Sequence, residues 1–516
     1  MKICMLFAFG RYLGVDYIAA FLEQKGHDVS LIMDPFLFHW WGTKTIKKFF
    51  SYTPLIVDKV VREKPDLVAF SVISDTYGWA LSTAEEIKKK INVPVIFGGV
   101  HPSSVPERVI KEDPVDYVCV GEGEEAMLDL VEALKNGEDT SKIPNLWSKV
   151  KGEIVKNEPR PLLSNLDSLP FPSMGTYNGE VKDTRWFCGT YSVAATRGCI
   201  YKCTYCIHSC LTKTYKGKGP YFRRRSVDNV IEELKYAKKN FKIRTLVILE
   251  DEIITNDLKW LKEFCEKYKQ EINLPFACQT HPGYLTPEVV QMVETAGCIV
   301  LGLGIQTISD QLKKDILHRS EVSENVAEQI GWLKKSRMLL VCNILLDFPG
   351  QDEKELLNIA RFLNEHRPDL PMFYWFRYYP GTEIVSIAEE RGFLSQEEVE
   401  LIEENKEWKP FTRGCNILYK QEYNSLVGLI LVSHILPKRL FNFIYDKELY
   451  RHNSFLLRIV IHFYRVIAFV YQFFAYRPKK VMYQLTFLGV GKYLVYSMSR
   501  VIFHKIRLYF GKENIF

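Results

Sequence analysis

Apolar and polar positions alternate between two kinds of segment over the first 150 residues. Short apolar runs, such as KICMLFAF at 2–9 and DLVAFSVI at 66–73, are separated by longer amphipathic stretches such as WALSTAEEIKKKI at 79–91. Apolar runs of four to eight residues are typical of strands covered on both faces, and the stretches between them have the period of helices. The pattern predicts a doubly wound, Rossmann-like α/β domain over residues 1–150.

The predicted strands of this first domain end in glycine-containing segments, FGG at 97–99 and VGEG at 120–123. Doubly wound sheets bind ligands at the carboxyl ends of their strands, which is where these glycines fall. No G-x-G-x-x-G follows the first strand, so the dinucleotide fingerprint is absent. The residues alone therefore predict a ligand at the strand tips without naming it.

The pattern changes twice more along the chain. Residues 151–190 have little periodicity and contain four prolines, which predicts a linker. Strand-like runs separated by helical stretches resume over 191–400, from SVAATRG at 192–198 to MFYWFRYYPG at 372–381. About six such units predict a βα barrel that is incomplete relative to the eight-stranded form. Residues 401–516 read as a helical C-terminal region in which aromatic and aliphatic residues mix with Lys and Arg.

Three cysteines in the segment RGCIYKCTYCIH, Cys199, Cys203 and Cys206, have the spacing C-x-x-x-C-x-x-C. They directly follow a predicted strand, so they are expected on the catalytic rim of the barrel. Thiolates suit iron–sulfur clusters, and three ligands on a four-iron cluster leave one iron open. Two alternatives remain at this point: a zinc site completed by Cys210 or His208, and buried cysteines that bind no metal.

This cysteine spacing after a first barrel strand resembles that of the radical S-adenosylmethionine (SAM) superfamily. The resemblance implies a 4Fe–4S cluster on the three cysteines, whose open iron chelates SAM and cleaves it to methionine and a 5′-deoxyadenosyl radical. An external electron donor such as flavodoxin or ferredoxin would supply the electron. The resemblance also implies SAM contacts near the adenine, amino group, ribose and carboxylate. The residues at the matching positions are Tyr205, Glu250 or Asp251, Gln306 (where a Glu is common) and Arg319.

With such a barrel behind it, the first domain is similar to the cobalamin-binding domain of one subclass of that superfamily. The segments FSVIS (70–74), FGGVHPSSVPE (97–107) and YVCVGEGEEAMLDLVEAL (117–134) carry this likeness, and LSNLDSLPFPS (163–173) resembles the linker of that subclass. The residues implied as cobalamin contacts are Ser71, Gly98, Gly99, His101, Gly121, Glu122 and Gly123.

The first domain departs from many cobalamin proteins in one respect. The motif D-x-H-x-x-G, whose histidine binds cobalt, is absent from residues 1–150. We therefore expect cobalamin to be bound without a histidine ligand from that motif, and we expect His101 not to reach the cobalt. A degenerate domain that keeps the fold without the cofactor is the alternative.

Composition places the chain among ordinary globular proteins, with 47% hydrophobic and 25% charged residues in a length of 516. Twelve cysteines are too dilute for a disulfide scaffold. The N-terminal apolar run is broken by Gly10, Arg11 and Asp16, so it predicts a buried strand rather than a signal peptide. These features together predict a cytoplasmic protein.

The charge is unevenly distributed between the body and the C-terminal region. Residues 410–516 carry 16 Lys and Arg against 4 Asp and Glu, whereas residues 1–409 carry 52 against 58. The densest apolar stretch, 455–480, is interrupted on one helical face by charged or titratable side chains and is followed by more positive charge. Those side chains are Arg458, His462, Arg465, Lys479 and Lys480. This pattern favours a helix lying on the anionic inner face of a membrane over a spanning helix.

An ordinary helical cap packed on the barrel is the alternative for this region. Nucleic acid is not an expected partner, because phosphate contact does not need so many aliphatic residues.

The subclass mostly methylates unactivated carbon or phosphorus. The resemblance therefore implies a class B, cobalamin-dependent radical SAM methyltransferase, and we expect its substrate to be a small molecule, either lipid-like or a secondary metabolite. Two other functions stay open. One is a radical SAM oxidoreductase or cyclase whose cobalamin carries no methyl group, and the other is a non-catalytic zinc-binding adaptor on membranes.

Overall fold

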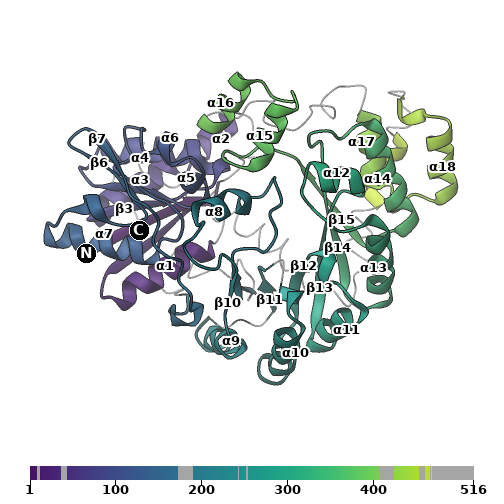
Figure 1. Ribbon diagram of the computed structural model, residues 1–516, viewed down its shortest axis with the longest axis horizontal. Helices are drawn as coiled ribbons and strands as arrows, with labels where there is room; N and C mark the ends of the chain where they lie inside the picture. Colours follow the sequence, from purple (N-terminus) through teal and green to yellow (C-terminus); the bar gives the residue numbers. More distant parts are fainter. Residues whose placement is uncertain are drawn as a thin grey trace.

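The computed structural model describes residues 1–8, 12–36, 44–172, 190–241, 243, 245–251, 254–405, 424–451, 459–464 and 466–467. Figure 1 shows two α/β bodies side by side, followed by a group of C-terminal helices. The first body is the purple and blue part of the ribbon, and the second is teal and green.

The first domain is built on a seven-stranded sheet with the order β2-β1-β3-β4-β5-β6-β7. Its first five strands are parallel, and helices cover both faces, as the alternating pattern predicted. One face packs on α3 and α4 and the other on α1 and α7. The bounds are β1 Lys2–Ala8, α1 Leu13–Gln24, β2 Asp28–Asp34, α3 Thr53–Glu63, β3 Leu67–Ser71, α4 Tyr77–Lys88, β4 Val95–Gly98, β5 Tyr117–Cys119 and α7 Glu124–Asn136. The strand order reverses between β1 and β3, which is the position where such sheets form a ligand cleft.

The sheet continues beyond the boundary expected at residue 150. Strands β6 (Leu146–Val150) and β7 (Glu153–Lys156) form an antiparallel hairpin that extends the first sheet. Its two turn residues, Lys151 and Gly152, have φ of 50° and 87°, as tight hairpin turns that match strand twist require. The Lys-Gly pair between two alternating runs was the signal for this hairpin.

The second domain is an open barrel of six parallel strands in the order β15-β14-β13-β12-β11-β8. Helices α9, α10, α11, α13 and α14 cover its outer surface (Figure 1). The bounds are β8 Thr190–Val193, α9 Val227–Phe241, β11 Leu246–Leu249, α10 Leu258–Lys267, β12 Phe276–Thr280, α11 Pro287–Ala296, β13 Cys298–Gln306, α13 Ser323–Lys335, β14 Leu339–Leu346, α14 Glu353–His366 and β15 Leu370–Trp375. Because β8 and β15 are the two edges of this sheet, the partial barrel expected from the sequence is confirmed.

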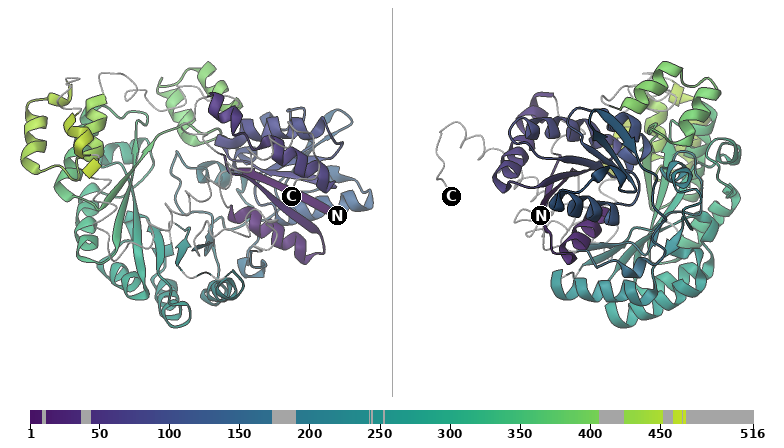
Figure 2. Two further views of the ribbon diagram at one scale, coloured as in Figure 1. Left: turned by 180° about the vertical axis from the view of Figure 1, so that it is seen from behind. Right: turned by 60° about the vertical axis from the view of Figure 1, so that its left-hand side comes forward.

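The first domain contacts the barrel beside both of its edge strands. Next to β8, the Tyr17 hydroxyl of α1 accepts a hydrogen bond from Arg225 at 3.0 Å and donates one to Glu233 at 3.3 Å. Just after β15, Arg377 forms an ion pair with Asp75 of the first domain. Figure 2 shows the two domains in contact from two further directions. The first domain therefore bridges the open side of the barrel.

The described C-terminal helices pack on the outside of the barrel. Helix α17 (Asn424–Val432) shares an apolar cluster with α14, and the Asn364 side-chain amide donates to the carbonyls of Ser433 and Leu436 at 2.6 and 2.9 Å. Helix α18 (Lys438–Asp446) joins the same cluster through Phe441 and Ile444. Within the described part of the chain, no helix combines the length and apolar character needed to cross a bilayer.

The stretch expected to form an interfacial helix lies mostly outside the described residues. Arg458, Arg465, Lys479 and Lys480 are among the residues that the structure does not describe, and so is the whole of 468–516. His462 is described and lies in the short helical segment 459–464.

Candidate active site between the two domains

The three motif cysteines lie on a loop that leaves the barrel after β8, residues 194–207, which we call the cluster loop. Asp251, which directly follows β11, fixes the start of this loop. Its carboxylate accepts hydrogen bonds from the backbone amides of Ala195 and Thr196 at 2.6 and 2.8 Å, and its side chain is buried. The Asp251 carboxylate is thus used within the protein, whereas the neighbouring Glu250 side chain is exposed at the end of the same strand.

Gly198 sets the direction of the cluster loop immediately before the first cysteine. Its φ is 79°, and a Cβ at this position would lie 2.1 Å from the carbonyl oxygen of Tyr221. A side chain here would meet rigid backbone, because Tyr221 precedes β10 (Arg223–Arg224), which pairs with β9 (Thr196–Arg197). Only glycine fits both the space and the backbone conformation.

Two partly buried tyrosines, Tyr205 and Tyr221, lie near the motif cysteines. Burial raises the pKa of Tyr221 above its ordinary value, and the nearby Cys206 and Cys199 sulfurs raise it further. Burial likewise raises the pKa of Tyr205, and Cys203 and Cys206 add to that rise. Each of the three cysteines is therefore near at least one of these two tyrosines.

The surroundings of the cysteines suit an iron–sulfur cluster. The Tyr201 amide donates to Cys199 Sγ at 3.4 Å, and Cys203 is 8% exposed. Amide donors and a water-poor setting are what cluster sulfurs require. Among the described residues, no group of three or more His, Cys, Asp or Glu side chains is arranged to hold a single metal ion. Cys210 lies further along, in α8 (His208–Thr214).

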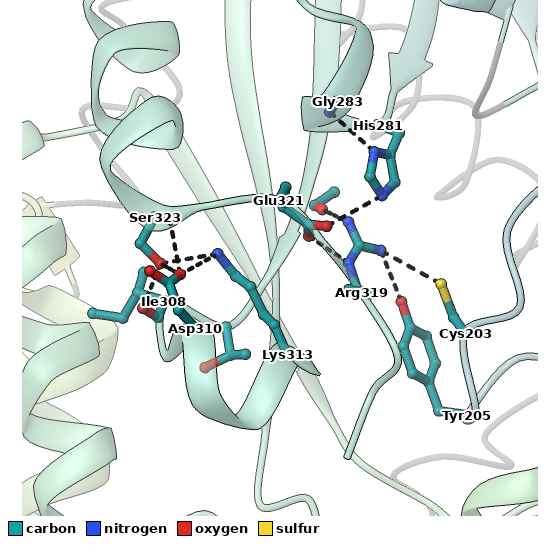
Figure 3. Close-up of polar contacts among 12 residues, drawn as sticks. Cys203, Tyr205, His281, Gly283, Ile308, Asp310, Lys313, Arg319, Glu321 and Ser323 are labelled. Carbon is teal, nitrogen blue, oxygen red and sulfur yellow. Dashed lines mark hydrogen bonds and ion pairs between the residues drawn. The ribbon is translucent and has the colours of Figure 1, made fainter. Parts of the chain in front are cut away.

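A buried polar network lies beside Cys203 (Figure 3). Arg319 Nη1 is 3.9 Å from Cys203 Sγ and donates to the Tyr205 hydroxyl at 3.2 Å. Its Nε donates to Glu321 at 2.5 Å, and Nη2 donates to the Gly304 carbonyl at 2.7 Å. Arg319 is 6% exposed, so the guanidinium is held from three sides against the cluster loop.

His281, after β12, extends this network away from the cysteines. Its Nε2 lies 3.5 Å from the Glu321 carboxylate, and its Nδ1 accepts a hydrogen bond from the Gly283 amide at 3.0 Å. The Tyr201 ring stacks on the imidazole, with 3.9 Å between the ring centroids. Burial lowers the pKa of His281 to about 3, and the positive charges of Arg319 and Lys313 contribute to the same direction. The imidazole is therefore neutral near pH 7.

Gln306 ends β13 in a conformation that is rare for a side-chain-bearing residue. Its φ is 62°, and the pairing of β13 with β14 shifts register between Gly304 and Gln306. Left-handed backbone at the rim of a barrel is a costly arrangement that persists where the surroundings enforce it. The bulge places Gln306 at the carboxyl end of its strand, on the same rim as the cluster loop.

An interdomain cavity of about 390 Å³ lies at the carboxyl tips of the first sheet. Its floor is apolar and includes Met5, Ile96 and Met127. All of the residues expected to contact cobalamin line it except His101. They are Ser71, Gly98, Gly99, Gly121, Glu122 and Gly123. The barrel supplies the opposite wall through Arg197, Gly198, His208, Leu211, Tyr215, Tyr221 and Arg223.

Two glycines of this cavity have backbone conformations that side chains rarely adopt. Gly99 has φ of 101°, and a Cβ there would lie 2.8 Å from the Val72 carbonyl oxygen. Gly121 has φ of 85°, and a Cβ there would lie 1.8 Å from the Tyr215 hydroxyl. That hydroxyl accepts a hydrogen bond from the Glu122 amide at 2.6 Å. The absence of a side chain at Gly121 is therefore needed for the contact between the domains as well as for the cavity.

His101 is sealed inside the first domain. It is 1% exposed, its Nδ1 lies 3.1 Å from the Ser74 hydroxyl, and its ring packs on Tyr77 at 4.2 Å. Burial lowers its pKa to about 3, with a smaller effect from the charge of Arg377. This position supports the expectation that His101 does not reach the cobalt.

Two ion pairs join the first domain to the barrel at the cavity wall. Glu122 receives two hydrogen bonds from Arg223, at 2.5 and 3.0 Å, and Glu124 pairs with Arg197 at 2.5 Å. Glu122, which was expected beside the corrin ring or its tail, lines the cavity and is also engaged by an arginine of the barrel. Nothing in the sequence pattern marked the two arginines or Tyr215 as functional, although Arg197 stands two residues before the first motif cysteine.

The two cofactor sites have the chemistry that cobalamin and a cluster need. An apolar cavity with glycine backbone at its rim can accept a large flat ligand and its nucleotide tail. Three thiols on one loop, one of which accepts from a backbone amide, can hold a four-iron cluster that keeps one iron open.

Family models match both domains. Residues 9–131 match the B12 binding domain, and residues 193–363 match the Radical SAM superfamily.

Curated relatives extend this likeness over most of the chain. An uncharacterised methyltransferase of Pyrococcus horikoshii is 25% identical over 88% of this chain and 93% of its own length. A cytidylyl-2-hydroxyethylphosphonate methyltransferase of Streptomyces wedmorensis is 24% identical over 75% and 79%. An anaerobic magnesium-protoporphyrin IX monomethyl ester cyclase of a Synechocystis species is 22% identical over 74% of each chain.

Solved structures share the architecture. The radical SAM methyltransferase TsrM from Kitasatospora setae, bound to tryptophan and a SAM analogue, superposes with a TM-score of 0.65 at 16% identity, over 83% of this chain and 88% of that one. The cobalamin-dependent SAM radical enzyme OxsB with aqua-cobalamin gives a TM-score of 0.62 at 16% identity, over 99% and 81%. The chain thus belongs to the radical SAM enzymes that carry a cobalamin-binding domain, and its cofactors are a 4Fe–4S cluster, SAM and cobalamin.

Proposed function

We propose that this enzyme methylates an unactivated carbon of a small-molecule substrate. The observation that carries the proposal is the shared wall between the interdomain cavity and the cluster loop, to which Arg197 and Gly198 both belong. A cobalamin in that cavity and a SAM on the cluster would face one reaction space. When bound, these cofactors supply a hydrogen-abstracting radical and a transferable methyl group.

The chain's own residues bind and orient these groups. Cys199, Cys203 and Cys206 hold the cluster. The SAM contacts that we propose are Tyr205, Glu250, Gln306 and Arg319, with Asp251 acting through the loop that it fixes. The cobalamin contacts that we propose are Ser71, Gly98, Gly99, Gly121 and Gly123, with Glu122 holding the cavity wall. The first domain, by closing the open side of the barrel, excludes water from the reaction space.

The type of reaction and the class of substrate are further parts of the proposal. The first two relatives named above are methyltransferases, which favours methyl transfer. The Synechocystis relative is a cyclase, so a reaction in which cobalamin carries no methyl group is the second candidate. We propose a lipid-like compound or a secondary metabolite as substrate, and flavodoxin or ferredoxin as the electron donor.

Product analysis tests methylation against cyclisation. The protein is purified without oxygen, its iron, sulfide and cobalamin are measured, and it is incubated with a reductant, a membrane and metabolite extract, and methyl-labelled SAM. A methyltransferase forms both S-adenosylhomocysteine and 5′-deoxyadenosine and labels the product. A cyclase forms 5′-deoxyadenosine without S-adenosylhomocysteine, and that result would contradict methylation.

Cysteine variants test the assignment of the cluster ligands. Cys199→Ala, Cys203→Ala and Cys206→Ala should each lose the visible thiolate-to-iron absorption and the cleavage of SAM. Cys210→Ala is the matched control, because Cys210 is also half-buried but lies a helical turn beyond the loop, and it should keep both. Loss of the cluster in Cys210→Ala together with its retention in Cys199→Ala would overturn the assignment.

We also propose that the C-terminal region attaches the enzyme to the inner face of an anionic membrane. The described end of this region exposes large apolar side chains: Phe443 is 55% and Phe463 is 61% exposed. The abundance of Lys and Arg over residues 410–516 adds the positive charge that such attachment needs.

A further inference from the structure

Arg319 is directed at a cluster ligand by a set of hydrogen bonds that use most of its donors. The guanidinium has five N–H groups. One is donated to Glu321, one to the Gly304 carbonyl, one to the Tyr205 hydroxyl, and one points at Cys203 Sγ from 3.9 Å. Only one N–H is therefore left for SAM, whereas a two-pronged grip on a carboxylate needs two.

The guanidinium cannot turn away from Cys203 without losing buried partners. Glu321 is 3% exposed at its side chain, and its second oxygen lies 3.5 Å from His281 Nε2. Figure 3 shows Arg319 between the acidic side chain of Glu321 on one side and Cys203 and Tyr205 on the other. The charge of Arg319 is thus fixed in position beside the cluster loop.

We propose that Arg319 is a positioning residue that raises the reduction potential of the cluster through Cys203. The inference rests on the proposed ligation of the cluster by Cys203. An N–H directed at a ligand sulfur, and a positive charge in a water-poor site, both stabilise the more negative reduced cluster. The nearby carboxylate of Glu321 opposes this effect, because it places a negative charge in the same network. The reduction potential of the cluster therefore lies between the values that Arg319 alone and Glu321 alone would give.

Potentiometric titration of the cluster, followed by electron paramagnetic resonance in the absence of SAM, tests this role. Removing the donor and the charge in Arg319→Met should shift the midpoint to a more negative potential. Arg319→Lys keeps the charge without the guanidinium donors and should give a smaller shift. Glu321→Gln keeps a hydrogen-bond acceptor for Arg319 but removes the opposing charge, so its midpoint should move to a more positive potential. A residue that only contacts SAM would leave every one of these SAM-free midpoints unchanged.

The opposite signs expected for Arg319→Met and Glu321→Gln distinguish tuning from general damage, which would move both in one direction. Should Arg319→Met fail to take up iron, the smaller negative shift expected for Arg319→Lys still decides the matter. Wild-type midpoints in Glu321→Gln and Arg319→Lys, at full iron content, would overturn the inference. Retention of the cluster in Cys203→Ala would instead show that the proposed ligand set has failed.

Discussion

Gly198 is the residue on which the path of the cluster loop depends. Gly198→Ala would add a Cβ 2.1 Å from the Tyr221 carbonyl oxygen in a left-handed backbone, so the loop must shift. We expect low iron incorporation and a lower melting temperature.

Gly217→Ala is the matched control for this prediction. Gly217 has nearly the same φ, 77°, but a Cβ there meets no atom within 4 Å. It should cost only the roughly 1–2 kcal/mol of the left-handed conformation and keep the cluster. Equal iron loss in the two variants would show that backbone conformation, rather than the clash with Tyr221, is responsible.

His101 makes the stability of the first domain dependent on pH. Its pKa of about 3 in the folded chain lies below the roughly 6.5 of an unfolded one, so below pH 6.5 the unfolded state binds more protons. The stabilisation is complete above pH 6.5 and declines as the pH falls towards 3, by about 1.4 kcal/mol at pH 5.5.

Urea unfolding at pH 7.5 and pH 5.5 measures this effect. The loss of stability on acidification should be smaller by that amount in His101→Gln than in the wild type. His318→Gln serves as the control, because the His318 side chain is 45% exposed. An unchanged pH dependence in His101→Gln would show that His101 is not the group responsible.

Among the elements, the β5–α7 segment is joined to the cluster loop by an ion pair. Glu124 begins α7 and is paired with Arg197, which leads into the cysteine motif. Glu124→Gln would keep a hydrogen-bond acceptor but remove the negative charge that faces a mostly buried guanidinium, at a cost of about 1–3 kcal/mol. Since both residues line the interdomain cavity, cobalamin should also bind more weakly.

The neighbouring glutamate offers a control for this prediction. Glu125 pairs with Arg160 at 2.9 Å but is 52% exposed, so Glu125→Gln should cost at most about 1 kcal/mol and leave cobalamin binding unchanged. Thermal unfolding and cobalamin titration of both variants give the comparison. Similar cobalamin affinities in Glu124→Gln and Glu125→Gln would show that the Glu124–Arg197 ion pair does not affect cobalamin binding.

The elements themselves were largely predictable from the sequence, because apolar runs report strands that are covered on both faces. The segment SVAATRG was expected to be one strand, and the structure divides it into β8 and β9. Asp251 causes the division by binding the amides between them, and it lies 55 residues from Thr196.

The cysteine motif was recognisable because its ligands are close in sequence. Arg223 and Arg319 were harder to assign, because the residues that they contact, Glu122 and Cys203, lie more than 100 positions away in the chain. Local patterns contain no information about such pairs.

Across the chain, the uneven charge makes the proposed membrane attachment testable. Each basic residue near an anionic surface contributes about 1 kcal/mol, so replacing both Lys479 and Lys480 by Gln should weaken binding to phosphatidylglycerol vesicles by about 2 kcal/mol. Co-sedimentation with these vesicles, and with phosphatidylcholine vesicles, measures the effect. The same replacements at Lys89 and Lys90, in the first domain, should change nothing. Equal binding to both lipids would contradict electrostatic attachment.

Because the barrel is open, its two edge strands would be affected by removal of the first domain. Strands β8 and β15 are the edges of the six-stranded sheet, and the first domain contacts the barrel beside both. Exposed edge strands are templates for pairing with other chains. A barrel made without residues 1–150 would present both edges to solvent and would tend to self-associate into aggregates. We therefore expect the first domain to limit such self-association in the intact chain, which sedimentation of the two forms would measure.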